Sequence, residues 1–454
     1  MTQQNLDYDG IPASLAALAV KPGDSGYEEA RSTYVWPGSP GLVLRPQSSE
    51  QVGEALAFAR TQDVPLAVRS GGHGINGRST NDGGIVIDLG GLDRVEVIDR
   101  DRRLVRLGAG ARWGDVAQVL ARHGLAISSG DHGGAGVGGL ATSGGQGLLG
   151  RYYGLTIDHV VGAEVVLADG PIVRADAEHN PDLFWAIRGA AGNIGIVTSL
   201  DIEAAEVGDI VFAIFIHDAS DTAAFLQKWG AQVERSPREL TPFMSVFGQG
   251  SGAIAQTYAV WAGDDTEAAA AALAPFLEIA PVLQQQAQLM PYAAFMAPVH
   301  HGHYGQAQVR SRSALLDHLD APTATAVVGM LTDGDIGMFQ IRSIGGAVND
   351  TPADTTAYAH RTQNFGLSAM VNENRRAEAD RVWAELASGG IYLNFETHSD
   401  ATSLANAFPP ATLERLRAVK AAYDPDNVFR TSVPIVAGSP PFADHNPAVT
   451  ATGI

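Results

Sequence analysis

The sequence RSGGHGING occupies residues 69–77 and directly follows a short apolar stretch that predicts a β-strand at residues 65–69. Glycines in such a loop let consecutive backbone amides turn toward an anion, as in loops that cradle phosphate. A histidine, His73, lies inside the loop. It either caps a turn or contacts a bound ligand, and this stretch taken alone leaves both readings open.

Two further glycine-rich segments lie downstream. The sequence GDHGGAGVGGLATSGGQG at residues 130–147 has nine glycines in eighteen residues, and apolar residues flank both ends. Bare backbone anchored at both ends favours contact with a large flat or pyrophosphate-bearing ligand over a mobile loop. The sequence RGAAGNIGIVT at residues 188–198 runs into a predicted strand at residues 194–200, whereas a Rossmann fingerprint opens a helix. Dinucleotide binding in the Rossmann manner is therefore disfavoured.

Composition narrows the function classes further. The chain has 454 residues, which predicts more than one domain, and its 50 acidic and 30 basic residues give a net charge of −20. That charge disfavours nucleic acid and anionic membranes as partners. Cysteine is absent, so neither a disulfide nor a cysteinyl cofactor link can form. The first residues lack the pattern of a secretory signal, and we expect a cytoplasmic protein.

The order of the predicted elements indicates an α+β fold. Residues 49–62 and 113–123 have helical spacing, whereas residues 95–107 and 160–175 predict hairpins. Beyond residue 207 the glycine clusters give way to an alanine-rich helix at 264–277 and a longer strand at 339–344. An amphipathic helix at residues 413–422 follows. Strands and helices mix without strict alternation, which favours α+β over a doubly wound parallel sheet.

The motifs together resemble those of one family. The ordered set is RSGGHGINGRSTNDGGIVIDL, the second glycine segment, RYYGLTIDHVVGAEVVLADG, DLFWAIRGAAGNIGIVT, YLNF and YDPDNVFR. It is similar to the berberine bridge enzyme-like flavin oxidases of the vanillyl-alcohol oxidase/PCMH superfamily, over residues 42 to 435. The resemblance implies a two-part PCMH-type FAD-binding domain at residues 1–205 and a substrate domain at 206–415, with an antiparallel sheet backed by helices. Residues 416–454 would return to the first domain.

The resemblance also implies which residues hold FAD. His73 matches the family histidine that is bonded to the 8α-methyl carbon of the flavin. The other cofactor-binding positions are Arg69, Ser70, Gly71, Gly72, Gly74, Asn76, Gly77, Gly130, Asp131, His132, Gly138, Gly139, Thr142, Gly144, Gly145, Asn193, Gly195, Val197, Tyr392 and Asn394. Many members carry a second flavin bond to a cysteine where this chain has His132, so the chain resembles the singly linked bacterial branch.

Three residues are candidates for the reaction itself. Tyr392 and Asn394 match the family's Y-x-N pattern beside the reacting face of the flavin. Tyr392 is the first candidate for the base, although its ordinary pKa near 10 would have to fall. His132 is the second candidate, because histidine titrates near neutrality, and it is equally a candidate for a structural hydrogen-bond donor. Asn394 accompanies Tyr392 in the motif.

Two positions depart from the family pattern. An acidic base of some members falls near Thr355, and we expect strand alternation to turn the neighbouring Asp354 to the opposite face. Gln146 replaces a tyrosine that assists catalysis in some relatives. Trp383 and Phe395 could stack on a substrate, but core packing is the preferred interpretation for both.

The crowded histidines at His300, His301 and His303 raise the question of a metal site. A substrate-pocket wall is favoured over zinc, because no fourth ligand lies close by in sequence. We therefore expect no metal.

The activity that the resemblance implies is oxidation of a small molecule by FAD. A base takes a proton from an O–H or N–H of an alcohol, sugar, amine or secondary metabolite while hydride passes to flavin N5, and O2 is reduced to hydrogen peroxide. A dehydrogenase or redox-neutral cyclase on the same scaffold, and a non-catalytic flavin-binding protein, are the alternatives. We expect a monomer or a homodimer.

Overall fold

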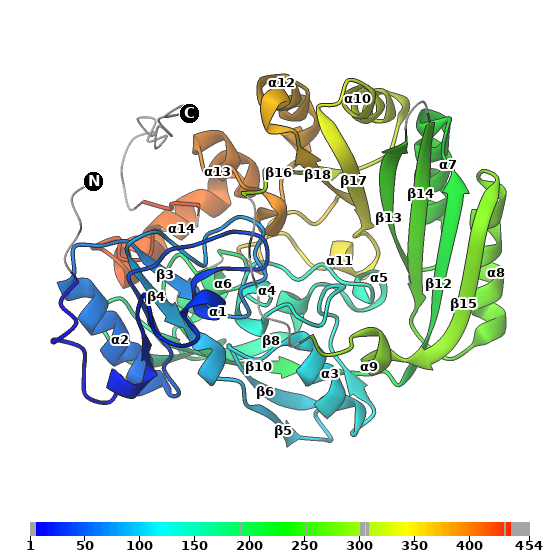
Figure 1. The fold of residues 1–454 in the computed structure, drawn as a ribbon. Coiled ribbons are helices and arrows are strands. Elements are labelled where there is room, and N and C mark those ends of the chain that lie inside the picture. Colours follow the sequence, from blue (N-terminus) through cyan, green and yellow to red (C-terminus); the bar gives the residue numbers. More distant parts are fainter. Residues whose placement is uncertain are drawn as a thin grey trace.

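The computed structural model describes residues 6–190, 192–249, 252–299, 305, 308–430 and 433–436 of the chain. Three main sheets organise it (Figure 1), so the expected α+β class is confirmed. The first is a four-stranded sheet in the order β1-β2-β4-β3. Its strands are β1 (Ala19–Val20), β2 (Leu42–Leu44), β3 (Leu66–Arg69) and β4 (Ile85–Asp88). The parallel strands β2, β4 and β3 direct their carboxyl ends to one edge, and the first glycine loop begins where β3 ends.

Helix α2 (Ser49–Thr61) makes the crossover between β2 and β3. Its amino terminus is fixed by Ser48, whose hydroxyl oxygen accepts a hydrogen bond from the Gln51 amide at 3.3 Å. Val52, Ala55, Leu56 and Ala59 recur at helical spacing and are buried, so they hold the helix against the sheet. This packing fixes the position of β3 and of the loop that follows it.

A five-stranded antiparallel sheet, in the order β5-β6-β10-β8-β9, lies next along the chain. Its strands are β5 (Val95–Asp99), β6 (Leu104–Gly108), β8 (Val160–Val166), β9 (Ile172–Asp176) and β10 (Ile196–Glu203). A short pair joins β7 (Leu125–Ala126) to β11 (Ala205–Glu206). The accompanying helices are α1 (Tyr27–Arg31), α3 (Trp113–Ala121), α4 (Val137–Leu140), α5 (Gly150–Tyr153) and α6 (Pro181–Ile187). Both predicted hairpins are therefore confirmed.

A seven-stranded antiparallel sheet in the order β15-β12-β14-β13-β17-β18-β16 forms the second half of the molecule. Its strands are β12 (Asp209–Asp218), β13 (Leu240–Gln249), β14 (Gly252–Trp261), β15 (Val282–Pro291), β16 (Ser311–Leu316), β17 (Ile336–Ser343) and β18 (Phe365–Val371). The helices of this half are α7 (Thr222–Arg235), α8 (Thr266–Leu273), α9 (Tyr292–Phe295), α10 (Ala321–Thr332), α11 (Ala347–Asp350), α12 (Arg376–Leu386) and α13 (Ala401–Ala407). Helices α7, α10 and α12 cover one face of the sheet (Figure 1). The opposite face is turned toward the glycine segments.

The alanine-rich helix predicted at 264–277 is divided. The α-helix α8 ends at Leu273, and a 3-10 helix follows at Ala274–Glu278. Pro275 explains the division, because proline lacks the backbone N–H that would continue the α-helical hydrogen bonding.

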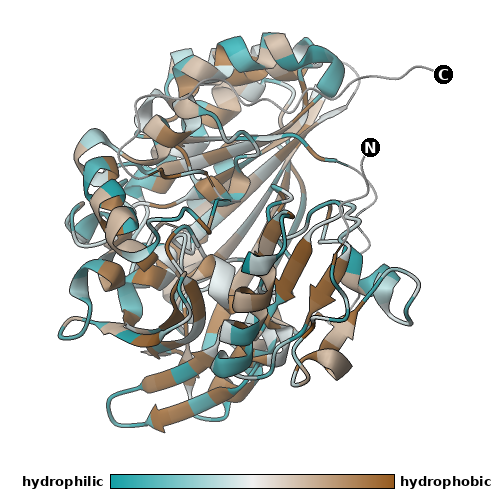
Figure 2. Cartoon of the chain, turned by 90° about the vertical axis from the view of Figure 1, so that its left-hand side faces the viewer, coloured by the Kyte–Doolittle hydropathy of each residue, from teal (hydrophilic) through white to brown (hydrophobic). Residues whose placement is uncertain are grey.

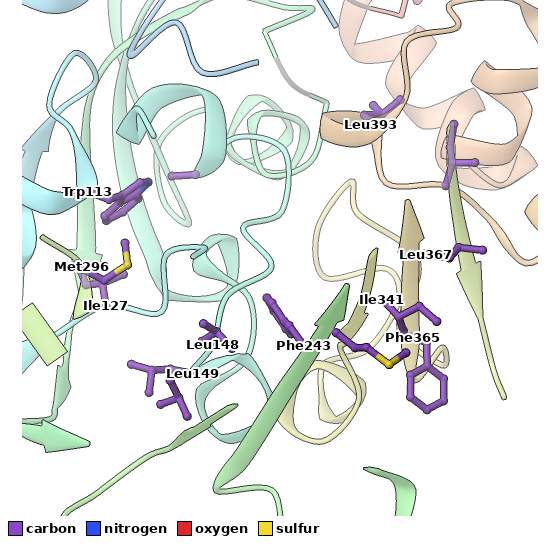
Figure 3. Packing of buried hydrophobic residues seen from close by; sticks show 14 of the residues in the cluster. Trp113, Ile127, Leu148, Leu149, Phe243, Met296, Ile341, Phe365, Leu367 and Leu393 are labelled. Carbon is purple, nitrogen blue, oxygen red and sulfur yellow. The ribbon is translucent and has the colours of Figure 1, made fainter. Parts of the chain in front are cut away.

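Helix α14 (Pro410–Tyr423) returns to the first half and packs against α6. One hydrophobic cluster extends through both halves: Figure 3 shows Trp113, Ile127, Leu148 and Leu149 with Phe243, Ile341, Phe365 and Leu367. In Figure 2 the interior strands are largely hydrophobic, whereas hydrophilic residues gather on outer loops and helix surfaces. Among the described helices, none is long and apolar enough to span a membrane.

Candidate active site

A cavity of about 590 Å³ lies where the glycine segments face the seven-stranded sheet. Most of the predicted site residues line it, namely Ser70, Gly71, Gly72, His73, Gly74, Asn76, Gly130, Asp131, His132, Gly138, Gly139, Thr142, Gly195, Val197, Tyr392 and Asn394. These residues come from four separate stretches of the chain. The fold therefore brings the sequence motifs together around one space of the size that binds small molecules.

Five predicted residues do not line the cavity and instead support its wall. Arg69 is buried and forms an ion pair with Asp88 at 2.8 Å. Gly77 has a φ of +72°, and a Cβ there would meet the Trp36 indole at 2.7 Å. The remaining three, which lie behind the wall, are Gly144, Gly145 and Asn193.

These three residues have defined contacts. A Cβ on Gly144 would come within 2.9 Å of the Tyr392 ring. The Gly145 amide donates to the Tyr392 hydroxyl oxygen at 3.0 Å. The side-chain amide of Asn193 donates to the Ala190 carbonyl at 2.5 Å, while the backbone carbonyl of Asn193 accepts from Lys420 Nζ at 2.7 Å. Their contacts are with protein groups, which gives them a positioning part in the site.

His73 belongs to a cluster of three rings with Tyr34 and His132. Its imidazole stacks on Tyr34 with ring centroids 4.2 Å apart and an interplanar angle of 12°. The ring centroids of His73 and His132 are 4.5 Å apart. Nδ1 of His132 accepts a hydrogen bond from the Gly134 amide at 3.0 Å, so the proton of the neutral ring is on Nε2. Tyr34 was not found by sequence reasoning, because no motif marks it.

The glycine segments fit a flat, phosphate-bearing ligand such as FAD. A Cβ on Gly139 or Gly192 would meet no described atom within 4 Å, and both residues line the cavity, so a side chain there would occupy ligand space. Gly71 and Gly136 meet closely, since a Cβ on Gly136 would lie 2.1 Å from the Gly71 nitrogen. The loops thus interlock through bare backbone and leave a cradle between them.

The sheet supplies a polar wall. Tyr258, Phe243 and Arg342 stand opposite one another on β14, β13 and β17, and therefore share one face. Nη2 of Arg342 donates to Asp131 at 3.1 Å, and the Tyr258 hydroxyl donates to the same carboxylate at 3.4 Å. Gln340 donates to the Tyr258 hydroxyl oxygen at 2.6 Å. Burial, reinforced by the Asp131 carboxylate, raises the pKa of Tyr258, so its hydroxyl stays protonated.

Tyr392 presents the other reactive hydroxyl. Its oxygen accepts hydrogen bonds from the Gly145 amide at 3.0 Å and from Nδ2 of Asn394 at 2.8 Å. Two such donors stabilise a phenolate. Burial works against them and leaves the pKa of Tyr392 above its ordinary value. The short 3-10 helix Leu393–Phe395 places Asn394 beside the hydroxyl.

Asp354 lies away from the cavity, as expected, but the strand that was assumed at this position is absent. Residues 353–355 lie in an exposed turn, and neither Asp354 nor Thr355 lines the cavity. Their carbonyls instead accept hydrogen bonds from Trp185 and Arg188, at 2.8 and 3.1 Å. Asp354 is therefore kept from the cavity by an exposed turn and not by strand alternation. The carboxylate that does line the cavity belongs to Asp131.

Besides Tyr34, the cavity residues that the sequence did not reveal include Arg78, Tyr258, Gln340 and Arg342. Arg78 donates to the carbonyls of Glu396 and His398 at 3.3 and 3.0 Å, and burial lowers its pKa to about 10. Its place directly after the glycine loop was the one available signal. The other three lie on strands whose alternation resembles that of any sheet.

Two aromatic interpretations had opposite outcomes. Phe395 lines the cavity, where the Arg342 guanidinium lies 4.1 Å from its ring centroid. The preferred interpretation of Phe395 as a core-packing residue is therefore incomplete. Trp383 is a core residue, fully buried, with its indole N–H donating to the Ser313 carbonyl at 2.8 Å.

Gln146 lines the cavity and donates to the Tyr358 hydroxyl at 3.4 Å. The histidines His300, His301 and His303 lie outside the described residues.

Known proteins share both the sequence and the fold. Residues 40–176 match the family model of an FAD binding domain, and residues 392–435 match the model for berberine and berberine-like proteins. (R)-6-hydroxynicotine oxidase from Paenarthrobacter nicotinovorans is 29% identical over 448 residues, covering 92% of this chain and 96% of that protein.

Solved structures agree with these matches. The structure of 6-hydroxy-D-nicotine oxidase from Arthrobacter nicotinovorans is 25% identical, covers 92% of this chain and 97% of its own, and superimposes with a TM-score of 0.77. Glucooligosaccharide oxidase from Acremonium strictum, described with a 6-S-cysteinyl, 8α-N1-histidyl FAD, is 23% identical, covers 94% and 99%, and has a TM-score of 0.80.

The fold, the cradle and these matches define an FAD-dependent oxidoreductase. The chain carries a match to an FAD binding domain and a berberine-like segment, and over 92% of its length it is homologous to 6-hydroxynicotine oxidase.

Proposed function

We propose that the protein oxidises a neutral, hydroxyl-bearing small molecule, such as an alcohol or a sugar, with a flavin attached covalently through His73 alone. The observation that carries the proposal is the convergence on one cavity of His73, the open glycine cradle and the Tyr392–Asn394 pair. Bound FAD would accept two electrons from the substrate in the form of one hydride and would pass them to O2 to give hydrogen peroxide.

Attachment through a single histidine has direct support in the chain. Glucooligosaccharide oxidase is named for both a cysteinyl and a histidyl flavin link, whereas this chain contains no cysteine. His73 lies on the cavity wall, stacked on Tyr34 and close to His132. The Gly134 amide occupies the lone pair of His132 Nδ1. His73 is preferred as the attachment site because it lies within the RSGGHG loop, where the related flavin oxidases carry their linking histidine.

The polar wall favours a neutral substrate. Asp131 and Arg342 neutralise one another at 3.1 Å, so neither charge is left over for an ionic group of a ligand. The Tyr258 hydroxyl, the Gln340 amide and the Asn394 amide remain as hydrogen-bonding groups around the cavity, and Phe395 offers an apolar face. Such a set suits hydroxyl groups on a carbon framework better than a carboxylate or a phosphate.

Tyr392 is the residue that we assign to proton removal. The Gly145 amide and Asn394 donate to its oxygen, so negative charge that develops there is stabilised by fixed dipoles. Its own hydroxyl proton must leave before it accepts one from the substrate, which demands a lowered pKa at the moment of reaction. Removal of water from the cavity by substrate would strengthen both hydrogen bonds.

The proposal is tested with the purified yellow protein. After acid denaturation the flavin should stay with the chain, and the mass should exceed that of the 47.5 kDa polypeptide by one FAD. His73→Ala should release its flavin on denaturation, whereas His132→Ala should keep it. A screen of alcohols and sugars that reads peroxide identifies the substrate. Covalent flavin in His73→Ala contradicts the attachment site, and turnover of a substrate without peroxide contradicts the oxidase.

A further inference from the structure

Strand β15 forms an unprotected edge of the seven-stranded sheet. It stands at the end of the strand order, so only one of its two sides pairs with another strand among the described residues. Eight of its ten residues are exposed, on both faces of the strand. Protein sheets normally protect such an edge with charged residues, prolines or a covering segment. The sequence VLQQQAQLMP carries no charge, and its one proline is the last residue.

The exposed leucines of β15 are unusual in this molecule. Leu283 and Leu289 are 60% and 49% exposed, more than any other large hydrophobic side chain of the described residues. They flank the centre of the strand at equal distances, three residues before and three residues after Gln286. A further strand that pairs with this edge would remove the two leucine side chains from water, which favours strand addition here.

The strand is complementary to itself. A two-fold interface places each residue against its symmetry mate, so its sequence must match when read in the opposite direction. Antiparallel pairing of two copies about Gln286 sets Leu283 opposite Leu289, Gln284 opposite Gln288, and Val282 opposite Met290 of the second copy. At the centre, Gln286 meets Gln286. Leucine thus opposes leucine, valine opposes methionine and Gln284 opposes Gln288, while Gln285 faces the small Ala287.

Charge separates β15 from the rest of the surface. The chain has a net charge of −20, so two copies repel each other over most orientations. A ten-residue edge without a charged side chain is a place where this repulsion is smallest. The register with β12 is regular from Gln284 to Pro291 and shifts only at Leu283, so the backbone around Gln286 is not distorted.

We propose that two copies of the chain associate through β15, with antiparallel pairing centred on Gln286, so that the two seven-stranded sheets become one continuous sheet. The cavities are separate from this edge, because no residue of β15 lines the cavity. The dimer therefore forms independently of flavin attachment and of turnover.

The mass of the holoprotein in solution is the first test. Light scattering coupled to size exclusion should give twice 47.5 kDa for the wild type. Leu283→Asp removes two leucine contacts per dimer and should raise the dissociation constant about a hundredfold or more. Ile98→Asp, an equally charged change at the 43% exposed Ile98 of edge strand β5, should leave the dimer unchanged. A wild type that stays monomeric at every concentration overturns the proposal, as does a dimer that Leu283→Asp leaves intact.

The register is tested by cysteine cross-linking, for which a chain without native cysteine is well suited. Gln286→Cys should form a disulfide-linked dimer on mild oxidation, because the two introduced side chains face each other across the axis. Gln284→Cys is the matched control, since its two copies would lie about 13 Å apart along the strands, beyond the reach of a disulfide. Equal cross-linking of both variants overturns the proposed register.

A mixture of charge variants supplies the last test. Gln286→Lys alone should be monomeric, because two ammonium groups would meet at the axis. Mixing Gln286→Lys with Gln286→Glu should restore a dimer that contains one copy of each. Failure of the mixture to associate, with both variants folded and yellow, overturns the central position of Gln286.

Discussion

Replacement of Tyr392 by phenylalanine separates a catalytic hydroxyl from a structural one. The change removes only the oxygen that accepts hydrogen bonds from the Gly145 amide and Asn394, and it keeps the ring that packs beside Phe395. If the hydroxyl removes the substrate proton, the rate of flavin reduction should fall by roughly a hundredfold to ten-thousandfold. The covalent flavin should remain, because His73 is untouched.

The structure also sets the expected pH dependence. Burial raises the pKa of Tyr392 above its ordinary value of 10.0, so only a small fraction of the free enzyme carries the phenolate near neutrality. The phenolate is the active form, and therefore kcat/KM should rise with pH, by about tenfold per unit while the pH stays below that pKa. In Tyr392→Phe this rise should disappear.

Stability must be measured alongside activity. The buried Gly145 amide loses its acceptor in Tyr392→Phe, which costs about 1–3 kcal/mol of unfolding free energy, whereas the half-buried Asn394 amide faces the cavity. Thermal unfolding confirms that the variant is folded at the assay temperature. Tyr358→Phe is the matched control, since Tyr358 is also buried, with its ring centroid 6.2 Å from that of Tyr392, yet it does not line the cavity.

Anaerobic stopped-flow measurement of flavin bleaching, over a range of pH, gives both quantities. Retention of more than a tenth of the wild-type rate, or an unchanged pH slope in the variant, would refute proton removal by Tyr392. A pH dependence that persists in Tyr392→Phe and is lost in His132→Gln would assign proton removal to His132.

Three other perturbations have defined outcomes. Lys420→Met leaves the buried Asp424 carboxylate without its cation and two carbonyls without their donor, because Lys420 Nζ contacts all three. Urea titrations should show an unfolding free energy lower by about 3–5 kcal/mol. Arg342→Met removes the partner of Asp131 and should reduce kcat/KM by about ten- to a hundredfold in steady-state assays. Burial and Arg312 lower the pKa of His398 from 6.5 to about 4, so its contribution is complete above pH 6.5 and is lost as the pH falls toward 4. Urea titrations at both ends of that window should show a loss in the wild type that His398→Gln reduces, by at most about 3 kcal/mol.

Controls make these outcomes decisive. Arg415→Met breaks an ion pair with Asp182 whose side chains are 45% and 65% exposed, and it should cost under about 1 kcal/mol. If Lys420→Met is as stable as Arg415→Met, the buried Lys420–Asp424 pair does not stabilise the fold. For Arg342, an unchanged kcat/KM would show that the polar wall does not contact the substrate. If the unfolding free energy falls equally in wild type and His398→Gln between pH 6.5 and 4, groups other than His398 cause the loss.

The glycine segments could be interpreted from the sequence because close approach of backbone leaves a signature in composition. Only glycine fits where Gly136 meets Gly71, and the same chemistry made His73 conspicuous. Hairpins and amphipathic helices were equally visible, since each depends on the spacing of neighbouring residues. The position of Asp354 was not visible, because its place in a turn depends on Trp185 and Arg188 far away in the chain.

The polar wall shows the limit of such reasoning. Tyr258 and Arg342 stand on different strands, and they share a face only through the register of β13 with β14 and β17. Their common partner, Asp131, comes from the second glycine segment. No local pattern predicts which of several polar strand residues will meet a loop that lies more than a hundred positions away.

The sequence by itself determined the class of cofactor, the glycine cradle, the histidine within it and the absence of any cysteine link. These features are local, because a ligand-binding loop must have the right residues at consecutive positions. The tertiary structure decided which residues support the cavity from behind, which polar groups complete its substrate side, and which strand edge stays open. These features depend on the pairing of distant strands, which is set by the energy of the whole core and is not written in any single segment.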